Sequence, residues 1–361
     1  MTPRLSAVGT EAGPASAWEE LRTIGSQEQW RQAGPEQSVA GVQPCMVFEP
    51  QNEAEVAAAL RCADSAGLTV IPRGNGSKSD WGNPPVRADL ILSTARLNRI
   101  IEHAWADLTV SVEAGCTIET LQTALAQHGQ RIALDPLWPE RATVGGILST
   151  NDSGTLRIRY GGLRDLVIGV TVALPDGTLA SSGGKVVKNV AGYDLPKLVT
   201  GALGTLGVIT RAVFRLHPLP QNETSFTFTA KDATDANRLV LAVQDSKLAH
   251  SGLQVRITLG VQPQVDIRFD GTDAGLAAQS ETLRKLAAPA NETESSGEVW
   301  QARQQLFGKS SQNDQACAVA KFSVLPASIA NTCEQLRDVS QPLNVRWQAV
   351  VQGTGLGWVR F

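Results

Sequence analysis

The stretch VIPRGNGSKSDWG, residues 70–82, joins a short apolar segment to a glycine loop. Gly74 and Gly76 leave the main chain of this loop unhindered, and Ser77 adds a hydroxyl group. Successive main-chain amides in such a loop can surround a phosphate group as an anion nest. The dinucleotide fingerprint GxGxxG fails here at Ser79, and the Walker pattern GxxxxGK[ST] fails too. The loop alone therefore leaves two interpretations open, a pyrophosphate-binding loop and a glycine turn that binds nothing.

The composition is that of a globular protein. Of 361 residues, 42% are hydrophobic and 19% are charged, which is enough material for two ordinary domains. The net charge of −3 argues against nucleic acid or an anionic membrane surface as the main partner. The five cysteines are far apart and form no CxxC pair, so a disulfide framework, a zinc site and an iron–sulfur cluster within this chain are not expected.

Targeting signals are not evident in the sequence. No apolar run approaches the roughly 20 residues that a membrane-spanning helix needs. The first residues, MTPRLSAVGTEAGPAS, lack the apolar stretch of a secretory signal. We therefore expect a cytoplasmic location.

Local patterns predict helices and strands in alternation. Residues 53–66 place apolar side chains on one face of a helix, and residues 108–114 alternate as a half-buried strand. Thr117 is expected to cap a helix that Gly129 ends, and Asp194 is expected to cap a short helix. Residues 134–164 show little periodicity and much glycine, proline and serine, which predicts a long irregular and functional stretch.

The domain organisation follows from these patterns, and the fold class is α+β. Beyond the segment His217–Pro220, strands and helices are interleaved in a way that predicts an antiparallel sheet with helices, with a polar connector at NETESSGE. We expect a loose N-terminal leader with short helices (1–38), a ligand-binding domain (39–220) with lobes at about 39–98 and 99–220, and a small α+β cap domain (221–361).

Two further glycine clusters support the phosphate interpretation of the first loop. Residues 143–154 combine small residues with hydroxyl and amide groups, and residues 201–209 contain three glycines. Small residues allow a flat ligand to lie against the main chain, while the polar groups bond its edge. Three separated glycine segments suit one long ligand that crosses a domain.

Five segments then resemble a known family in their order and spacing. The chain is similar to the vanillyl-alcohol-oxidase-type (PCMH-type) FAD-binding family over about residues 40–220. Within that family it most resembles the FAD-binding (E) subunits of bacterial glycolate oxidases. The resemblance implies a two-lobed α+β FAD-binding domain, with the flavin between its lobes, followed by the cap. The segments are PRGNGS (72–77), ATVGGILSTNDSG (142–154), RYGGLRD (159–165), LPDG (174–177) and YDLPKLVTGALGTLGVIT (193–210).

The resemblance also implies which residues hold FAD. Ser77 stands where some family members carry a histidine bonded to the flavin, and the cysteine of doubly linked members is absent, so non-covalent FAD is expected. The implied contacts fall into three groups, for the pyrophosphate, for the flavin with its ribityl chain, and for the adenosine end. The pyrophosphate group consists of Arg73, Gly74, Asn75, Gly76, Ser77 and Lys78. The flavin and ribityl group consists of Thr143, Gly145, Gly146, Thr150, Ser153 and Gly154. The adenosine group consists of Gly207, Val208 and Ile209.

Catalytic residues are harder to identify. A flavin that oxidises a 2-hydroxy acid needs a base for the hydroxyl proton and a cation for the carboxylate. D-2-hydroxy-acid dehydrogenases of this fold carry a histidine-rich metal motif, whereas the four histidines here form no metal-like cluster, so no metal and no clear base are predicted. Arg157, Arg159 and Tyr160 are candidates to hold a carboxylate, and surface arginines with a packing tyrosine are the equal alternative.

The tryptophans are expected in the core or at an interface, and Trp138 is the one to test near the flavin. Cys116 is expected to be a small buried residue rather than a redox centre.

The resemblance implies an FAD-binding subunit of a multi-subunit glycolate oxidase or dehydrogenase. Such a subunit takes part in the oxidation of glycolate to glyoxylate. Its implied partners are a second FAD-containing catalytic subunit and an iron–sulfur subunit, through which it would reach the inner membrane only indirectly. Two alternatives remain open: a free-standing FAD-dependent oxidoreductase acting on another hydroxy acid or alcohol, and a non-catalytic FAD-binding scaffold.

Overall fold

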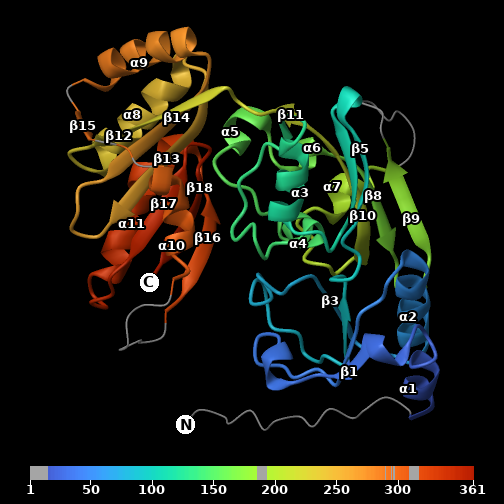
Figure 1. Cartoon of the computed structure of the whole chain (residues 1–361). Coiled ribbons are helices and arrows are strands. Elements are labelled where there is room, and N and C mark those ends of the chain that lie inside the picture. The colour runs from blue at the N-terminus through green and yellow to red at the C-terminus, as the bar shows by residue number, and fades with distance from the viewer. Residues whose placement is uncertain (1–14, 185–192, 289, 294, 296, 309–316) are drawn as a thin grey trace. The chain divides into compact units, whose positions relative to one another are not determined.

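The computed structural model describes residues 15–184, 193–288, 290–293, 295, 297–308 and 317–361 (Figure 1). These residues form two compact units. The first unit comprises the described residues up to Ile132 together with Trp138–Asp152 and Leu163–Pro218. The second unit comprises Ala133–Leu137, Ser153–Gly162 and the described residues from Leu219 to Phe361. Two short segments that precede residue 220 therefore belong to the second unit, whereas the sequence placed them in the ligand-binding domain.

The first sheet of the first unit has four strands in the order β1-β2-β4-β3. Strands β2, β4 and β3 are parallel, and β1 pairs antiparallel with β2. Because β3 ends at Arg73, the first glycine loop leaves the carboxyl end of this parallel sheet. The strands are β1 Trp30–Gln32, β2 Met46–Phe48, β3 Val70–Arg73 and β4 Leu90–Ser93.

The helix predicted at residues 53–66 is present as α2, Glu53–Ser65, and it packs on this sheet. Asn52 caps it by accepting a hydrogen bond from Glu55 N, and its apolar face packs against Phe48 and Leu90 in one buried cluster.

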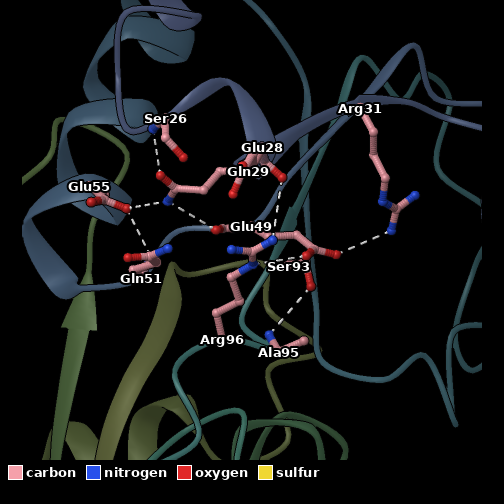
Figure 2. Close-up of polar contacts among 10 residues, drawn as sticks. All are labelled: Ser26, Glu28, Gln29, Arg31, Glu49, Gln51, Glu55, Ser93, Ala95 and Arg96. Carbon is pink, nitrogen blue, oxygen red and sulfur yellow. Dashed lines mark hydrogen bonds and ion pairs between the residues drawn. The ribbon is translucent and has the colours of Figure 1, made fainter.

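The N-terminal segment is less loose than the sequence predicted, although residues 1–14 lie outside the described part. It contains the short helices α1 Ala15–Leu21, η1 Gln27–Gln29 and η2 Pro35–Gln37 in addition to β1. Figure 2 shows the polar contacts that Ser26, Glu28, Gln29 and Arg31 make with neighbouring residues such as Glu49, Glu55 and Arg96. The Gln29 amide donates to Glu55 at 2.6 Å, while the Glu49 carboxylate lies 3.3 Å from Arg31 and 3.2 Å from Arg96. This segment is therefore integrated into the first unit.

The second sheet of the first unit is antiparallel, in the order β5-β6-β10-β8-β9. As predicted, Thr117 caps α3 and Asp194 caps α7. The Thr117 side chain accepts a hydrogen bond from Thr120 N, and the Asp194 side chain accepts one from Lys197 N. The strands are β5 Ile100–Ala104, β6 Thr109–Glu113, β8 Val167–Ala173, β9 Leu179–Gly183 and β10 Val208–Arg215, with a small pair β7 Gln130–Arg131 and β11 His217–Pro218; the helices are η3 Trp105–Asp107, α3 Ile118–Ala126, α4 Val144–Thr150, α6 Leu163–Leu166 and α7 Leu195–Val199.

Two expectations about this region were wrong. Every residue of β6 is buried, not every second one. The polar Glu113 can be buried because its carboxylate accepts from Arg99 at 2.7 Å. Residues 134–164 are not irregular throughout, since they contain α4 and the helix α5, Arg157–Tyr160. Gly145 and Gly146 have low helix propensity, so the sequence pattern of α4 does not predict a helix. The helix is stabilised at its start by Thr143, whose hydroxyl oxygen accepts a hydrogen bond from Gly146 N.

The second unit contains a seven-stranded antiparallel sheet in the order β15-β12-β14-β13-β17-β18-β16. Helices α8, α9 and α11 bury their apolar faces on one side of it, and α10 contributes to a smaller cluster with Trp358. The expected polar connector at 291–298 instead includes a short edge strand, β15. The strands are β12 Asn222–Thr229, β13 His250–Thr258, β14 Gln264–Gly271, β15 Asn291–Thr293, β16 Val319–Ser323, β17 Gln348–Gln352 and β18 Leu356–Arg360; the helices are α8 Ala233–Asp245, α9 Asp273–Ala287, η4 Gly297–Gln301, α10 Ala302–Gln305, η5 Pro326–Ser328 and α11 Ile329–Ser340.

Among the helices in the described ranges, none combines the length and the apolar character that crossing a lipid bilayer requires.

Candidate functional site

A cavity of about 440 Å³ lies in the first unit, where the three glycine segments meet. This volume is within the range of small-molecule binding sites. Every residue of the first unit that the sequence assigned to cofactor binding lines it. These residues are Arg73, Gly74, Asn75, Gly76, Ser77, Lys78, Thr143, Gly145, Gly146, Thr150, Gly207, Val208 and Ile209.

The first and second glycine segments are in direct contact. A Cβ atom on Gly74 would collide with Thr143 Oγ1 and would lie 3.0 Å from its Cγ2, so a side chain at position 74 cannot be accommodated without displacing Thr143. Gly76 has a φ of 72°, in the left-handed region, and a Cβ there would lie 2.6 Å from Arg73 Nε. The absence of a Cβ at positions 74 and 76 therefore lets the main chain of the loop lie close to Thr143 and Arg73, and it leaves main-chain amides unhindered for an anion.

The Arg73 guanidinium lies behind the loop and is half-buried. Its Nη1 donates to the Gln37 amide oxygen at 3.1 Å. Burial lowers the pKa of Arg73, and the nearby charge of Arg31 lowers it further. Arg73 thus places a partly desolvated positive charge beside the loop, which favours an anionic ligand.

The second and third segments add hydroxyl groups and close main-chain approach. Thr150 Oγ1 donates to Gly146 O at 2.8 Å within α4. Gly207 has a φ of 147°, and a Cβ there would lie 2.7 Å from Ala173 O, so the chain at the start of β10 runs directly against β8.

Ser153 and Gly154 are not among the residues that line this cavity, and they belong to the second unit. A Cβ atom on Gly154 would collide with Asp135, whose carboxylate accepts from Thr155 N at 2.9 Å and from Leu156 N at 3.1 Å. The buried guanidinium of Arg303 donates to Ser153 O at 3.1 Å and to Asp135 O at 2.9 Å. The shape of this loop is therefore set by Asp135 and Arg303, and the assignment of Ser153 and Gly154 to the flavin stays a prediction.

The candidate substrate residues Arg157, Arg159 and Tyr160 lie on α5 in the second unit. Tyr160 Oη donates to Asp270 Oδ2 at 3.1 Å, and Asp270 also accepts from Ser251 Oγ. Tyr160 therefore takes part in a hydrogen-bond network with Asp270 and Ser251 in the second unit. A role for these residues in holding a carboxylate stays a prediction.

His250 lies in the same region of the second unit. Its Nδ1 is 3.3 Å from Leu248 O. Burial lowers the pKa of His250, and the positive charge of Arg159 lowers it further, whereas the contact with Leu248 O opposes this shift. At neutral pH the imidazole is uncharged and able to accept a proton.

Several cavity residues were not recognised from the sequence. Trp81 lies inside the quoted stretch 70–82 and Ser149 inside the quoted segment 142–154, so assigning every polar or aromatic residue of these segments would have included them. Val39 and Thr94 come from distant parts of the chain, and only the fold brings them to the cavity. The unrecognised residues are Val39, Ile71, Pro72, Ser79, Trp81, Gly82, Asn83, Pro85, Thr94, Ser149, Leu203, Gly204 and Thr205.

Lys78, which lines the cavity, has its Nζ 5.4 Å from the centre of the Trp138 indole ring, and the proximity of Trp138 to the flavin stays a prediction. Trp138 is not among the residues that line the cavity. Within the described residues, no group of three histidine, cysteine or carboxylate side chains has the arrangement of a metal site.

Thiol reactivity tests the expectation that Cys116 is a buried structural residue. Burial, with a smaller effect from Glu113, raises the pKa of Cys116 to about 11, and burial raises that of Cys333 to about 12. Because the thiolate is the reactive form, both should resist a thiol reagent at pH 8 in the native chain. Exposed Cys317 should react rapidly with the reagent, and a Cys317→Ser variant should lack this rapid phase of the reaction. Rapid labelling of Cys116, measured by peptide mass mapping, would contradict this expectation.

The cavity fits the phosphate and adenosine parts of FAD. The glycine loop is joined by a half-buried guanidinium and by the hydroxyl groups of Ser77 and Thr143. These are donors suited to a pyrophosphate. No histidine or cysteine is among the described residues that line the cavity, and non-covalent attachment stays a prediction.

Comparisons with known proteins agree with this fit. Residues 44–183 match the family model of the FAD binding domain. Glycolate oxidase subunit GlcD of Bacillus subtilis is 31% identical over 211 residues, 58% of this chain and 45% of that protein. D-lactate dehydrogenase of Archaeoglobus fulgidus is 35% identical over 199 residues, 55% of this chain and 44% of that protein. The chain spans about half the length of the curated relatives it matches.

Solved structures share the fold at low sequence identity. Alkyldihydroxyacetonephosphate synthase has a TM-score of 0.78 at 17% identity, covering 99% of this chain and 79% of that one. p-Cresol methylhydroxylase has a TM-score of 0.79 at 13% identity, covering 96% of this chain and 82% of that one. The α+β fold predicted from the sequence is therefore confirmed. Residues 44–183 belong to the FAD binding domain family, of the PCMH type, and FAD is the cofactor of this domain.

Proposed function

We propose that the chain is the FAD-binding subunit of a multi-subunit glycolate oxidase or dehydrogenase. In this role it takes part in the oxidation of glycolate, a 2-hydroxy acid, to glyoxylate, and electrons pass to an iron–sulfur partner subunit. The observation that carries the proposal is the cavity in the first unit, in which the three glycine segments form one site that fits FAD.

The substrate class rests on what the relatives share. Their names describe glycolate oxidase, D-lactate dehydrogenase and D-2-hydroxyglutarate dehydrogenase, all of which act on a hydroxyl group next to a carboxylate. Bound FAD supplies a two-electron acceptor for such an oxidation. The residues of this chain that we assign to the substrate carboxylate are Arg157 and Arg159, with Tyr160 positioned by Asp270.

The partners follow from what the chain itself contains. Its five cysteines are dispersed, and those in the described residues are all unpaired, so the iron–sulfur cluster is assigned to another subunit. A second FAD-containing subunit would carry the main catalytic site. We place the complex in the cytoplasm, in contact with the inner membrane only through partners, with residues 39–220 as the FAD-binding domain and 221–361 as the cap.

One observation favours a second candidate function, a free-standing FAD-dependent oxidoreductase. His250 is half-buried, and its burial and the positive charge of Arg159 lower its pKa, which favours the uncharged imidazole. A neutral imidazole beside an arginine is the combination that removes a hydroxyl proton and holds a carboxylate. In this function the chain oxidises its substrate without a second flavoprotein.

The experiment that separates these functions is an anaerobic half-reaction. The purified chain with bound FAD is mixed with glycolate and, separately, with D-lactate, and the visible flavin absorbance is followed. The same mixtures are repeated with the complex isolated through a tag on this chain. The subunit proposal predicts bleaching by glycolate in the complex and an oxidised flavin in the isolated chain. Bleaching of the isolated chain that His250→Gln abolishes would support the free-standing enzyme, and an oxidised flavin in every mixture would contradict both.

A further inference from the structure

A second cavity, of about 200 Å³, lies in the first unit beside the FAD cavity. The two cavities share Arg73, Gly74 and Asn75, so the start of the first glycine loop is a wall common to both. Ligands of cofactor or drug size occupy sites of about 300–1,000 Å³, so the second cavity is too small for another nucleotide. It has room for a small ion with a few water molecules, each of which takes up about 30 Å³ in the liquid.

This cavity lies on the face of the first sheet that is turned away from α2. Phe48 and Leu90 pack in one cluster with α2. Their neighbours Val47 and Ile91, which line the cavity, point to the opposite face because side chains alternate along a strand. Arg31 is the register partner of Val47, so its side chain lies on that opposite face as well.

Polar groups gather at this cavity where three parallel strands end. Arg73 is the last residue of β3, Ser93 is the last residue of β4, and Glu49 follows β2 directly. Arg73 Nη1 donates to the Gln37 amide oxygen, but no described residue accepts a hydrogen bond from Arg73 Nε or Nη2. The Ser93 hydroxyl oxygen accepts from Ala95 N at 3.3 Å, and its own hydrogen has no acceptor in the described ranges. In open α/β sheets, ligands bind outside the carboxyl ends of the strands, where these donors lie.

The charges around the cavity leave a positive excess. The Glu49 carboxylate is shared between Arg31, at 3.3 Å, and Arg96, at 3.2 Å (Figure 2). Burial lowers the pKa of Arg73, and the positive charge of Arg31 lowers it further, whereas Glu36 opposes this shift. The carboxylates therefore offset the repulsion between the guanidinium groups of Arg31 and Arg73 only in part. An anion beside both groups would remove this repulsion and accept charge-assisted hydrogen bonds.

We propose that Arg31 and Arg73 form a binding site for a small oxyanion, separate from the FAD cavity. Its ligand is a phosphate ion or the carboxylate of a small acid, because both offer the paired oxygens that a guanidinium group binds. Arg73 also lines the FAD cavity, so a bound anion competes for positive charge that favours the FAD pyrophosphate. The anion should therefore weaken FAD binding by about fivefold, and FAD should weaken anion binding by the same factor, because coupling between two sites is reciprocal.

Titration calorimetry of the FAD-loaded chain tests this proposal, with inorganic phosphate and acetate as separate probes at constant ionic strength. We expect one saturable site, and the probe that binds more tightly identifies the kind of oxyanion. Arg31→Met should weaken binding at least about tenfold, because it removes charge-assisted hydrogen bonds. Arg31 is exposed on the edge strand β1, so this variant should keep the fold. Glu49→Gln should instead strengthen binding, because it removes a negative charge from the lining of the cavity.

Arg96→Met is the matched control. It removes the other guanidinium group that pairs with Glu49, but Arg96 is not among the residues that line the cavity. This variant should bind phosphate within about twofold of the wild type, because exposed ion pairs contribute little.

Saturable binding that is weakened by Arg31→Met and retained by Arg96→Met supports the proposal. Equal weakening in these two variants would indicate a general effect of surface charge and would overturn it. Absence of binding to the FAD-loaded chain would overturn it too, and binding to the apoprotein alone would then assign the anion to the FAD pyrophosphate site. Equal affinity for phosphate with and without FAD would refute the coupling through Arg73. The proposal rests on FAD binding by the first unit, and because neither glycolate nor a partner subunit is used, a failure of the proposed function does not affect this result.

Discussion

Gly74→Ala should weaken FAD binding more than any other single added methyl group in the first loop. The new Cβ would collide with Thr143 Oγ1 and lie within 3.1 Å of the Thr143 Cβ, so the whole Thr143 side chain must move. Thr143 also caps α4 through Gly146 N, and its displacement shifts the second glycine segment. Overpacking of this kind costs ~1–3 kcal/mol, which corresponds to a loss of up to about 100-fold in affinity for FAD.

The control for this variant is Gly184→Ala in the same unit, where a Cβ meets no atom within 4 Å and the backbone does not require glycine. The measurement is titration of each apoprotein with FAD, together with its thermal unfolding midpoint in the absence of FAD. Equal affinity for FAD in the Gly74 and Gly184 variants would show that the contact between the two loops does not shape the FAD site.

Arg303→Met should cause the largest local loss of stability in the second unit. The buried guanidinium donates to the main-chain oxygens of Ser153 and Asp135 and lies 4.8 Å from the centre of the Trp358 ring. Methionine retains much of the apolar stem but leaves one buried and one partly buried carbonyl group without these donors. Each buried acceptor left unsatisfied costs ~1–3 kcal/mol, so the expected loss is at most about 2–6 kcal/mol.

Hydrogen exchange in the intact chain measures this effect directly. The amides of Thr155 and Leu156, which donate to Asp135, should exchange faster in Arg303→Met than in the wild type. Arg238→Met, which removes an exposed ion pair with Asp235 in the same unit, should leave their exchange unchanged. Unchanged protection of Thr155 and Leu156 in Arg303→Met would refute the anchoring role of Arg303.

The sequence predicted those features whose cause is local. The cap residues Thr117 and Asp194 and the helix α2 were identified because capping and amphipathic periodicity act within a few residues. The glycine segments were identified because glycine is needed where neighbouring atoms leave no room for a Cβ, as at Gly74 against the Thr143 side chain and at Gly207 against the Ala173 main chain.

What the sequence did not predict depends on residues that are far apart in the chain. Lys78 was assigned to the pyrophosphate loop, but nothing near it indicates that Asp152 is its partner. Arg303 reaches Ser153 and Asp135 across a separation of 150 residues or more. Every residue of β6 is buried although apolar and polar types alternate, and Glu113 can be buried because its carboxylate accepts from distant Arg99, so alternation of residue types alone gave the wrong exposure.

The domain assignment shows the same limit. Segments 133–137 and 153–162 precede the predicted boundary at residue 220, yet they pack with the second unit. Their side-chain partners Arg303 and Asp270 come from beyond residue 220, so the local sequence of these segments carries no sign of their membership. Ser153 and Gly154 were grouped with Thr143 and Thr150 because the motif is continuous, whereas packing divides it after Asp152.

The claim that this chain binds FAD without a covalent bond is tested most directly by the visible absorption spectrum of the purified full chain, recorded before and after denaturation and removal of the protein. We expect a flavin spectrum from the native chain and the release of one FAD per chain into the supernatant. A colourless chain whose apoprotein does not bind added FAD, or a flavin that stays attached to the denatured chain, would contradict it.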